Sequence, residues 1–207
     1  MTIAVIGAAA GIGLESVILG LERGHHMIAM SRDTGRLADH RMLTKINGNA
    51  TNVRDLENVM VSADAVLITV GTKKKKGTTL FSEVAKAMIA AGKDLNYDKP
   101  VFIVTGFGAG DSKPYLNWFM KAVIRLFMKD QYADKTRMED MIAGSNLNWG
   151  IVRPGILTNG LLTENYQVLR TLHPGIKVGK VSRINVASYL ISEAENPVNL
   201  GLKITVT

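Results

Sequence analysis

The chain of 207 residues contains no cysteine, only five prolines, and few aromatic residues, which make up 6% of it. Without cysteine, a disulfide framework and thiolate chemistry are both excluded. No apolar run approaches the roughly 18 residues that a membrane helix needs. The start of the chain lacks the basic and apolar regions of a signal peptide. We therefore expect a cytoplasmic protein without a membrane partner.

Acidic residues are also outnumbered, with 18 Asp and Glu against 25 Lys and Arg, so the formal net charge is +7. Such an excess fits nucleic acid, an anionic membrane surface or an anionic small molecule. The cations are scattered except at Lys73–Lys76, and aromatic residues do not alternate with them, so we expect no nucleic-acid partner. The lysine run is either a solvated turn or an electrostatic funnel for an anion.

The opening stretch predicts a dinucleotide site. The β-branched residues Ile3–Ile6 indicate a buried strand, Gly7, Gly11 and Gly13 follow directly, and a helix then extends to about Arg23. Glycines permit the sharp turn and the close approach of a pyrophosphate, and the helix N-terminus attracts negative charge. The spacing G-x-x-x-G-x-G departs from G-x-G-x-x-G, and the alternative is an ordinary strand-to-helix turn.

Strands and helices alternate along the rest of the chain, which holds 46% hydrophobic and 21% charged residues. This alternation predicts one α/β domain over 1–207, with a doubly wound parallel sheet of the Rossmann type and helices on both faces. A small substrate-side portion is expected over about 154–207. The carboxyl ends of parallel strands share one edge, so ligand-binding loops should meet there. These loops are Ala8–Ile12, Ser31–Arg36, Gly71–Thr78, Gly106–Ser112 and Arg153–Thr158.

The tip of the second expected strand, Met27–Met30, bears on cofactor choice. An acidic residue at this position grips the ribose of NAD, but the chain has Ser31 and Arg32 here, and Asp33 comes one residue later. A guanidinium pairs well with a 2′-phosphate, so we predict NADP(H) in preference to NAD(H). Arg36 is a second candidate contact, and the alternative is a solvated basic turn.

A long helical region is expected from about Tyr115 to Ala143, broken near Asp130. Its Met- and Phe-rich part, Trp118–Met120 and Leu126–Met128, is interpreted as helix core, with a lid or an oligomer surface as the alternative. Glu139 and Asp140 are expected on the helix surface. The histidines lack metal-ligand spacing, so no metal site is predicted.

With these loops placed, the chain resembles the atypical branch of the short-chain dehydrogenase/reductase superfamily that contains biliverdin-IXβ and flavin reductases. The resemblance covers nearly the whole chain. It rests on Gly7-x-x-x-Gly11-Ile12-Gly13, Ser31-Arg32-Asp33, Val70-Gly71-Thr72, Ser145–Gly155 and Val181–Ala187. It implies an NAD(P)H-dependent reductase in which the Arg153-Pro154-Gly155 loop lies beside the nicotinamide.

Many members of that superfamily use a Tyr-x-x-x-Lys pair. The resemblance places Lys135 at the lysine position and Gln131 at the tyrosine position, while Tyr132 is one residue away. Residues three or four positions apart lie on the same face of a helix, so Tyr132 can still reach the site together with Lys135. The alternative is that Tyr132 is an ordinary packed tyrosine. The strand-end serine is also missing, and the nearest one is Ser112. Tyr132, Lys135 and Ser112 are therefore the catalytic candidates.

Cofactor contacts are predicted along the whole loop edge. The candidates are Gly7, Ala9, Ala10, Gly11, Ile12, Gly13, Ser31, Arg32, Arg36, Asn49, Ala50, Gly71, Thr72, Thr105, Gly106, Lys135, Pro154 and Ile156.

These observations favour an NADPH-dependent oxidoreductase that passes hydride to a flat conjugated acceptor, such as a flavin, a quinone or a linear tetrapyrrole. The acceptor is expected to be anionic and aromatic, with FMN as a substrate and not a bound cofactor, and the protein is expected to be a monomer or homodimer. The first alternative is a non-catalytic NADP(H) redox sensor. The second is a nucleotide-sugar epimerase, for which about 50 residues after Pro154 leave little room.

Overall fold

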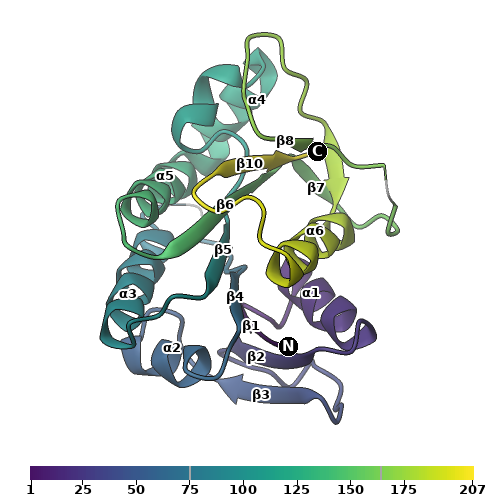
Figure 1. Ribbon diagram of the computed structural model, residues 1–207. Coiled ribbons are helices and arrows are strands. Elements are labelled where there is room, and N and C mark those ends of the chain that lie inside the picture. Colours follow the sequence, from purple (N-terminus) through teal and green to yellow (C-terminus); the bar gives the residue numbers. More distant parts are fainter. Residues whose placement is uncertain (75, 164) are drawn as a thin grey trace.

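The protein is built on one eight-stranded sheet (Figure 1). The computed structural model describes residues 1–74, 76–163 and 165–207. From edge to edge, the strands are β3 (Leu43–Asn47), β2 (His26–Ser31), β1 (Thr2–Ile6), β4 (Ala65–Ile68), β5 (Pro100–Val104), β6 (Asn148–Pro154), β10 (Lys203–Val206) and β8 (Val168–Leu169). Neighbouring strands are parallel except β10 and β8. The predicted parallel sheet is confirmed, and β8 adds an antiparallel edge.

The strand order turns back on itself next to β1. The chain first winds from β1 outward through β2 to β3, and then returns to place β4, β5 and β6 on the other side of β1. Loops that leave β1 and β4 therefore run to opposite faces of the sheet and leave a crevice between them. In doubly wound sheets this crevice is where nucleotides bind.

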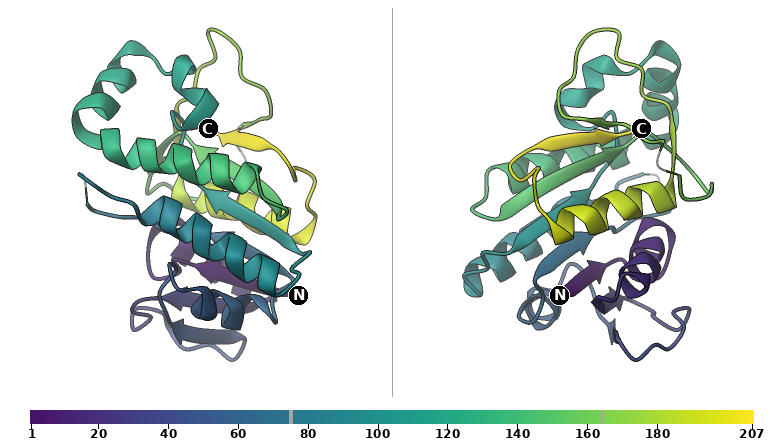
Figure 2. Two further views of the ribbon diagram at one scale, coloured as in Figure 1. Left: turned by 90° about the vertical axis from the view of Figure 1, so that its left-hand side faces the viewer. Right: turned by 45° about the vertical axis from the view of Figure 1, so that its right-hand side comes forward.

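Helices cover both faces of the sheet, as predicted (Figures 1 and 2). On one face α1 packs against α6, and on the other α3 packs against α2 and α5. Asn52 caps the start of α2, because its Oδ1 accepts the Asp55 N–H at 3.1 Å. The helices that cover the sheet are α1 (Gly11–Glu22), α2 (Val53–Met60), α3 (Leu80–Asp94), α5 (Lys129–Ala143) and α6 (Arg183–Glu195).

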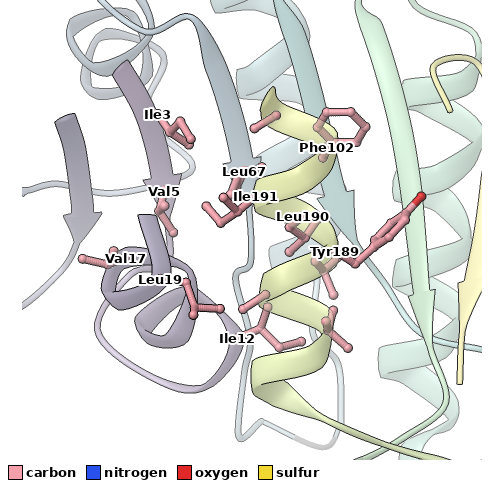
Figure 3. Packing of buried hydrophobic residues seen from close by; sticks show 14 of the residues in the cluster. Ile3, Val5, Ile12, Val17, Leu19, Leu67, Phe102, Tyr189, Leu190 and Ile191 are labelled. Atoms are coloured by element: carbon pink, nitrogen blue, oxygen red, sulfur yellow. The ribbon is translucent and has the colours of Figure 1, made fainter. Parts of the chain in front are cut away.

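The central strands are buried on both sides, which explains their continuous apolar sequences. Successive side chains of a strand point to opposite faces. Ile3 and Val5 pack toward α1 and α6, whereas Ala4 and Ile6 belong to the core on the other face. Figure 3 shows Ile3 and Val5 beside apolar side chains of α1 and α6. One strand thus supplies both cores and fixes where the glycine turn leaves the sheet.

The region expected as one long helix is divided into four parts. A 3-10 turn (η1, Gly110–Tyr115) and a short helix (α4, Trp118–Val123) precede a π-helical turn (η2, Ile124–Met128), and α5 follows. The predicted break near Asp130 is therefore present. The core assignment for the Met- and Phe-rich part is wrong, because α4 and η2 extend beyond the sheet and contribute only Ile124 to the small buried cluster there.

The chain after Pro154 serves two purposes. It returns to the main sheet as α6 and β10, and it also forms a separate pair of parallel strands, β7 (Ile156–Thr158) and β9 (Lys180–Ser182). These strands were not predicted, because three residues are too few to show a hydrophobic period. Within the described ranges, no helix has both the length and the apolar character needed to cross a bilayer.

Candidate functional site

The predicted loops lie at one edge of the sheet and are joined to one another by hydrogen bonds. The Ala9 N–H donates to Ser31 Oγ at 3.0 Å, which links the loops after β1 and β2. The Phe107 N–H donates to the Pro154 carbonyl at 2.9 Å, which links the loops after β5 and β6. Within each of these two pairs, the neighbouring loops therefore hold one another in place at this edge.

The glycine turn after β1 requires glycine at two positions for steric reasons. Gly7 has φ of +92°, and a Cβ there would lie 2.9 Å from the Val70 nitrogen. A Cβ on Gly13 would lie 2.3 Å from the Gly7 carbonyl oxygen, so this glycine lets α1 pack tightly against the strand. Gly11 has φ of +59°, and a Cβ there would meet only the Arg183 side chain, at 3.7 Å.

The start of α1 is suited to an anion. Its N-cap residue, Ala10, is exposed and provides no side-chain acceptor, and the first turn contains no acidic residue. The first N–H groups of a helix lack intrahelical partners and carry partial positive charge. The residues present therefore fit a pyrophosphate. The Ile12 side chain points into the core, so only its backbone is available to such a ligand.

The tip of β2 presents two free cations. Arg32 and Arg36 are exposed, and among the described residues neither forms an ion pair. The loop is held from below by Asn47, whose Oδ1 accepts both the Thr34 N–H at 3.1 Å and the Thr34 hydroxyl at 2.8 Å. Sequence analysis missed this role of Asn47, because its partner lies 13 residues away.

The predicted adenosine border is open. A Cβ on Gly71 would meet nothing within 4 Å, and Asn49 is exposed while Ala50 is half-buried. Thr72 is fixed through its carbonyl, which accepts from Gln131 Nε2 at 3.3 Å. Contacts of these residues with a nucleotide remain a prediction.

Gln131, at the position expected for a catalytic tyrosine, holds the basic loop instead. Besides Thr72, its Nε2 donates to the Lys74 carbonyl at 2.9 Å. The adjacent Asp130 accepts the Gly77 N–H at 2.7 Å. Of the four-lysine run, Lys75 lies outside the described residues, and the other three lysines are exposed. The start of α5 thus anchors the loop that follows β4.

A cavity of about 470 Å³ opens where β5 and β6 end. Other parts of its wall come from the segment 115–128, part of which sequence analysis offered as a lid, and from residues 176–179, which it had not placed in the site. Most of these additional residues are apolar, including Leu116, Met120, Ile176 and Val178. Six predicted residues line the cavity, namely Thr105, Gly106, Tyr132, Lys135, Pro154 and Ile156.

Tyr132 and Lys135 lie together on one wall of this cavity. A Cβ on Gly106 would be 3.3 Å from Tyr132 Oη and 3.4 Å from Lys135 Nζ, so both polar atoms border that glycine. Lys135 Nζ donates to the Thr105 carbonyl at 2.7 Å. Burial lowers the pKa of Lys135 to about 8, against the opposing charge of Glu139. Burial raises the pKa of Tyr132, so its hydroxyl keeps its proton at neutral pH.

Ser112 is not placed for catalysis. It is fully buried, its Oγ donates to the Ala109 carbonyl at 2.6 Å, and it accepts the Gly108 N–H at 2.8 Å. The residues that line the cavity do not include it. Its hydroxyl stabilises the turn after β5 and does not reach the cavity, which argues against the predicted catalytic role.

Behind the cavity is a buried ionic network that sequence analysis missed. Glu139, expected on the helix surface, is fully buried, so that expectation is wrong. Its carboxylate accepts the Thr105 hydroxyl at 2.6 Å and Arg153 Nε at 3.0 Å. Arg153 also pairs with Asp111. Burial alone lowers the pKa of Arg153, but hydrogen bonds and charge from the two carboxylates raise it overall. The sequence did contain one signal of this network, since Arg153 lies inside an otherwise apolar strand. A buried charge needs a partner, so this arginine predicts a buried acidic residue nearby.

A doubly wound sheet with a glycine turn at its reversal point and a cavity beside it defines a nucleotide-binding protein of the Rossmann type. A family model described as NAD(P)H-binding matches residues 7–197. The chain belongs to this NAD(P)H-binding family.

Several solved structures share the fold of this chain. A short-chain dehydrogenase/reductase of Veillonella parvula in complex with NADP matches with a TM-score of 0.84 and 19% identity, over 99% of this chain and 93% of that one. The anaerobillin reductase ChuY of Escherichia coli matches with a TM-score of 0.80 and 21% identity, over 100% and 96%. A proposed NADH-flavin reductase of Streptococcus pneumoniae matches with a TM-score of 0.77 and 20% identity, over 100% of this chain and 98% of that one. At these identities the similarity shows a shared fold.

Proposed function

We propose that the protein is an NADPH-dependent reductase of flat conjugated acceptors such as flavins, quinones or linear tetrapyrroles. The observation that carries the proposal is the mostly apolar cavity of about 470 Å³ at the ends of β5 and β6. It lies on the same sheet edge as the glycine turn, and it contains the buried pair Tyr132 and Lys135. The related fold of reductases that act on a bilin and a flavin supports this acceptor class.

The chain offers separate groups for each part of the cofactor. Backbone N–H groups at the start of α1 hold the pyrophosphate, and Gly7 and Gly13 let α1 begin close against the sheet. Arg32, with Arg36 beside it, pairs with the 2′-phosphate. Gly71 gives passage across the sheet edge, because nothing stands within 4 Å of the position of its missing Cβ.

When bound, the nicotinamide supplies the hydride, and the protein positions both partners and excludes water. Gly106, Pro154 and Ile156 line the cavity in which the acceptor would meet the cofactor. The Tyr132 hydroxyl holds the proton that a reduced acceptor needs. Lys135, mostly protonated at neutral pH with its pKa of about 8, lies beside that hydroxyl and holds the ribose.

The direct test is NADPH oxidation with FMN, dichlorophenolindophenol and biliverdin as acceptors, followed by absorbance. Turnover with at least one of them is expected, and it should be faster with NADPH than with NADH. A well-folded protein that binds NADPH but reduces none of the three would overturn the reductase proposal.

A second candidate is a non-catalytic NADP(H) sensor, which one observation favours. The hydroxyl set of typical members is missing here, because Gln131 holds the lysine loop, Ser112 holds a turn, and the Thr105 hydroxyl donates to Glu139. A sensor would bind NADP(H) tightly, transfer no hydride to a broad acceptor panel, and retain a protein partner only in one redox state of the nucleotide.

A further inference from the structure

Four large apolar side chains are exposed together on α4 and η2. The exposed fractions are 81% for Trp118, 58% for Phe119, 72% for Leu126 and 58% for Phe127. We refer to these four residues as the α4–η2 face. Isolated surface apolar residues are common, but four large exposed ones within ten residues of the chain indicate a site of interaction.

The same segment already uses its inner side. Ile124 is buried in the small cluster next to the cavity, and Met120 packs against that cluster. A helical segment that is apolar on both its inner and outer sides needs a second apolar environment to cover the outer one. In the part of the chain that the structure describes, the α4–η2 face keeps the exposure given above, so the covering environment comes from outside the chain.

The charge around the face indicates what covers it. From 112 to 129 the chain contains four cations, Lys113, Lys121, Arg125 and Lys129, and no Asp or Glu. All four are exposed, and none of them forms an ion pair among the described residues. Aromatic and leucine side chains interspersed with lysine and arginine are typical of segments that lie in the interface of an anionic bilayer.

The basic loop after β4 adds to this surface. Asp130 and Gln131, which directly follow the last of the four cations, hydrogen-bond to Gly77 and Lys74. The loop that carries the exposed Lys73, Lys74 and Lys76 is therefore tied to the start of α5, directly after η2. The positive charge is thus concentrated around the apolar group.

We propose that the α4–η2 face docks the protein reversibly on a membrane surface containing anionic lipids. The four apolar side chains enter the boundary between headgroups and acyl chains, and the surrounding cations meet lipid phosphates. A second copy of the chain is a poorer fit, because a two-fold contact would bring Lys121 and Arg125 against the same cations of its partner. The earlier expectation of no membrane partner depended on the absence of a spanning segment, which docking does not require.

Docking also has a consequence for the cavity. Leu116, Asn117, Met120 and Met128 belong to its wall, and all four lie on or beside α4 and η2. The cavity would therefore lie close to the lipid surface, within reach of apolar molecules dissolved there. The docking itself does not depend on the proposed reductase activity.

Vesicle flotation of the full chain tests the proposal. Two vesicle types are compared, phosphatidylcholine alone and phosphatidylcholine with added phosphatidylglycerol. Binding is expected only to the anionic vesicles and should fall with salt. The variant W118S/F127S should lower the partition coefficient by roughly tenfold or more, because both side chains lose their apolar environment. The variant K121Q/R125Q should lower it by roughly 10- to 30-fold.

Matched controls keep the test specific. V61S removes an apolar side chain that is 71% exposed at the end of α2. K86Q/K93Q removes two exposed positive charges from α3, the same number that K121Q/R125Q removes. Both should bind vesicles like the unchanged protein. In a W149F background, emission of the remaining Trp118 should shift to shorter wavelength when anionic vesicles are added.

Three outcomes would overturn the proposal. The first is no binding to anionic vesicles, and the second is binding that the α4–η2 variants and the control variants reduce equally. The third is a concentration-dependent dimer in ultracentrifugation that W118S/F127S converts to a monomer. Reduction of a soluble acceptor by NADPH should be equal in W118S/F127S and the unchanged protein. Failure of docking is thereby distinguished from failure of the reductase proposal.

Discussion

Arg153 and Glu139 form a two-point ion pair in the interior, directly behind the cavity. The distances are 3.0 Å from Nε to Oε1 and 2.5 Å from Nη2 to Oε2, and the two residues are 1% and 0% exposed. Thr105 connects this pair to the site, since its hydroxyl donates to Glu139 and its carbonyl accepts from Lys135. The position of Lys135 in the cavity therefore depends on a charge pair that is not itself part of the cavity wall.

Removing the charge of Glu139 should destabilise the fold. Glu139→Gln keeps the size of the side chain but leaves Arg153 buried with only Asp111 as a charged partner. Breaking one side of a buried pair is costly, so we expect the free energy of unfolding to fall by about 2–4 kcal/mol. Urea unfolding measures it. The control is Asp140→Asn on the exposed side of the same helix, which should change stability by less than about 0.5 kcal/mol. Equal effects would contradict this account of the pair.

The lowered pKa of Lys135 predicts a pH-dependent stability. Its pKa is about 8 in the folded protein against an ordinary value of 10.5. Between these two pH values the unfolded chain binds more protons than the folded protein. Burial of Lys135 therefore lowers the free energy of unfolding by its full amount below about pH 8, and this loss disappears as the pH rises to 10.5. It amounts to roughly 3 kcal/mol at most.

Lys135→Met removes that contribution, and comparison with the unchanged protein cancels all other titrations. The stability of the variant relative to the unchanged protein should therefore be higher at about pH 7 than at about pH 10. Urea unfolding at both pH values gives the two differences. A pH-independent difference would show that Lys135 titrates like an exposed lysine.

Tyr132 is the predicted proton donor, which Tyr132→Phe tests. Positioned proton transfer contributes roughly 10²–10⁴-fold to a rate, so kcat with the best acceptor should fall by about 10²-fold while NADPH affinity stays the same. Tyr115→Phe is the matched control, because Tyr115 also lines the cavity but does not border Gly106 and Lys135. If both variants lose activity equally, or neither does, solvent supplies the proton.

The sequence was sufficient for the sheet and the glycine turn, but not for the inward side of α5. Buried strands such as Ile3–Ile6 and Val101–Val104 are continuous apolar runs, and local sequence alone indicates them. On α5 the buried positions include Gln131, Asp134 and Glu139. Each polar group is satisfied by a partner distant in sequence, as in the 2.8 Å bond from the Phe81 N–H to Asp134. A hydropathy pattern assigns such residues to the surface, because it contains no information about their partners.

The error at α4 and η2 has the opposite cause. Trp118 and Phe127 have the composition of a core, but the sheet ends before it can cover them. Sequence periodicity shows which residues share a face. It does not show whether anything lies against that face, and this is where the structure changed the interpretation.

Cofactor choice is tested separately at the tip of β2. Arg32→Ala should weaken NADPH binding by roughly 1–3 kcal/mol, the scale of a charged hydrogen bond, and leave NADH binding nearly unchanged. Titration calorimetry with each nucleotide measures both. Arg41→Ala, an exposed arginine at the opposite end of β3, should affect neither. Equal losses for NADPH and NADH would show that Arg32 does not recognise the 2′-phosphate.

Two glycines of the cofactor edge should respond differently to the same added methyl group. A Cβ on Gly13 would stand 2.3 Å from the Gly7 carbonyl oxygen, whereas a Cβ on Gly71 would meet nothing within 4 Å. Gly13→Ala should therefore lower the free energy of unfolding by about 1–3 kcal/mol, because α1 must move away from the sheet. Gly71→Ala should leave stability within about 0.5 kcal/mol but weaken NADPH binding if the nucleotide crosses the sheet edge there. Urea unfolding and nucleotide titration of both variants separate packing from binding, and unchanged NADPH affinity in Gly71→Ala would place the cofactor path elsewhere.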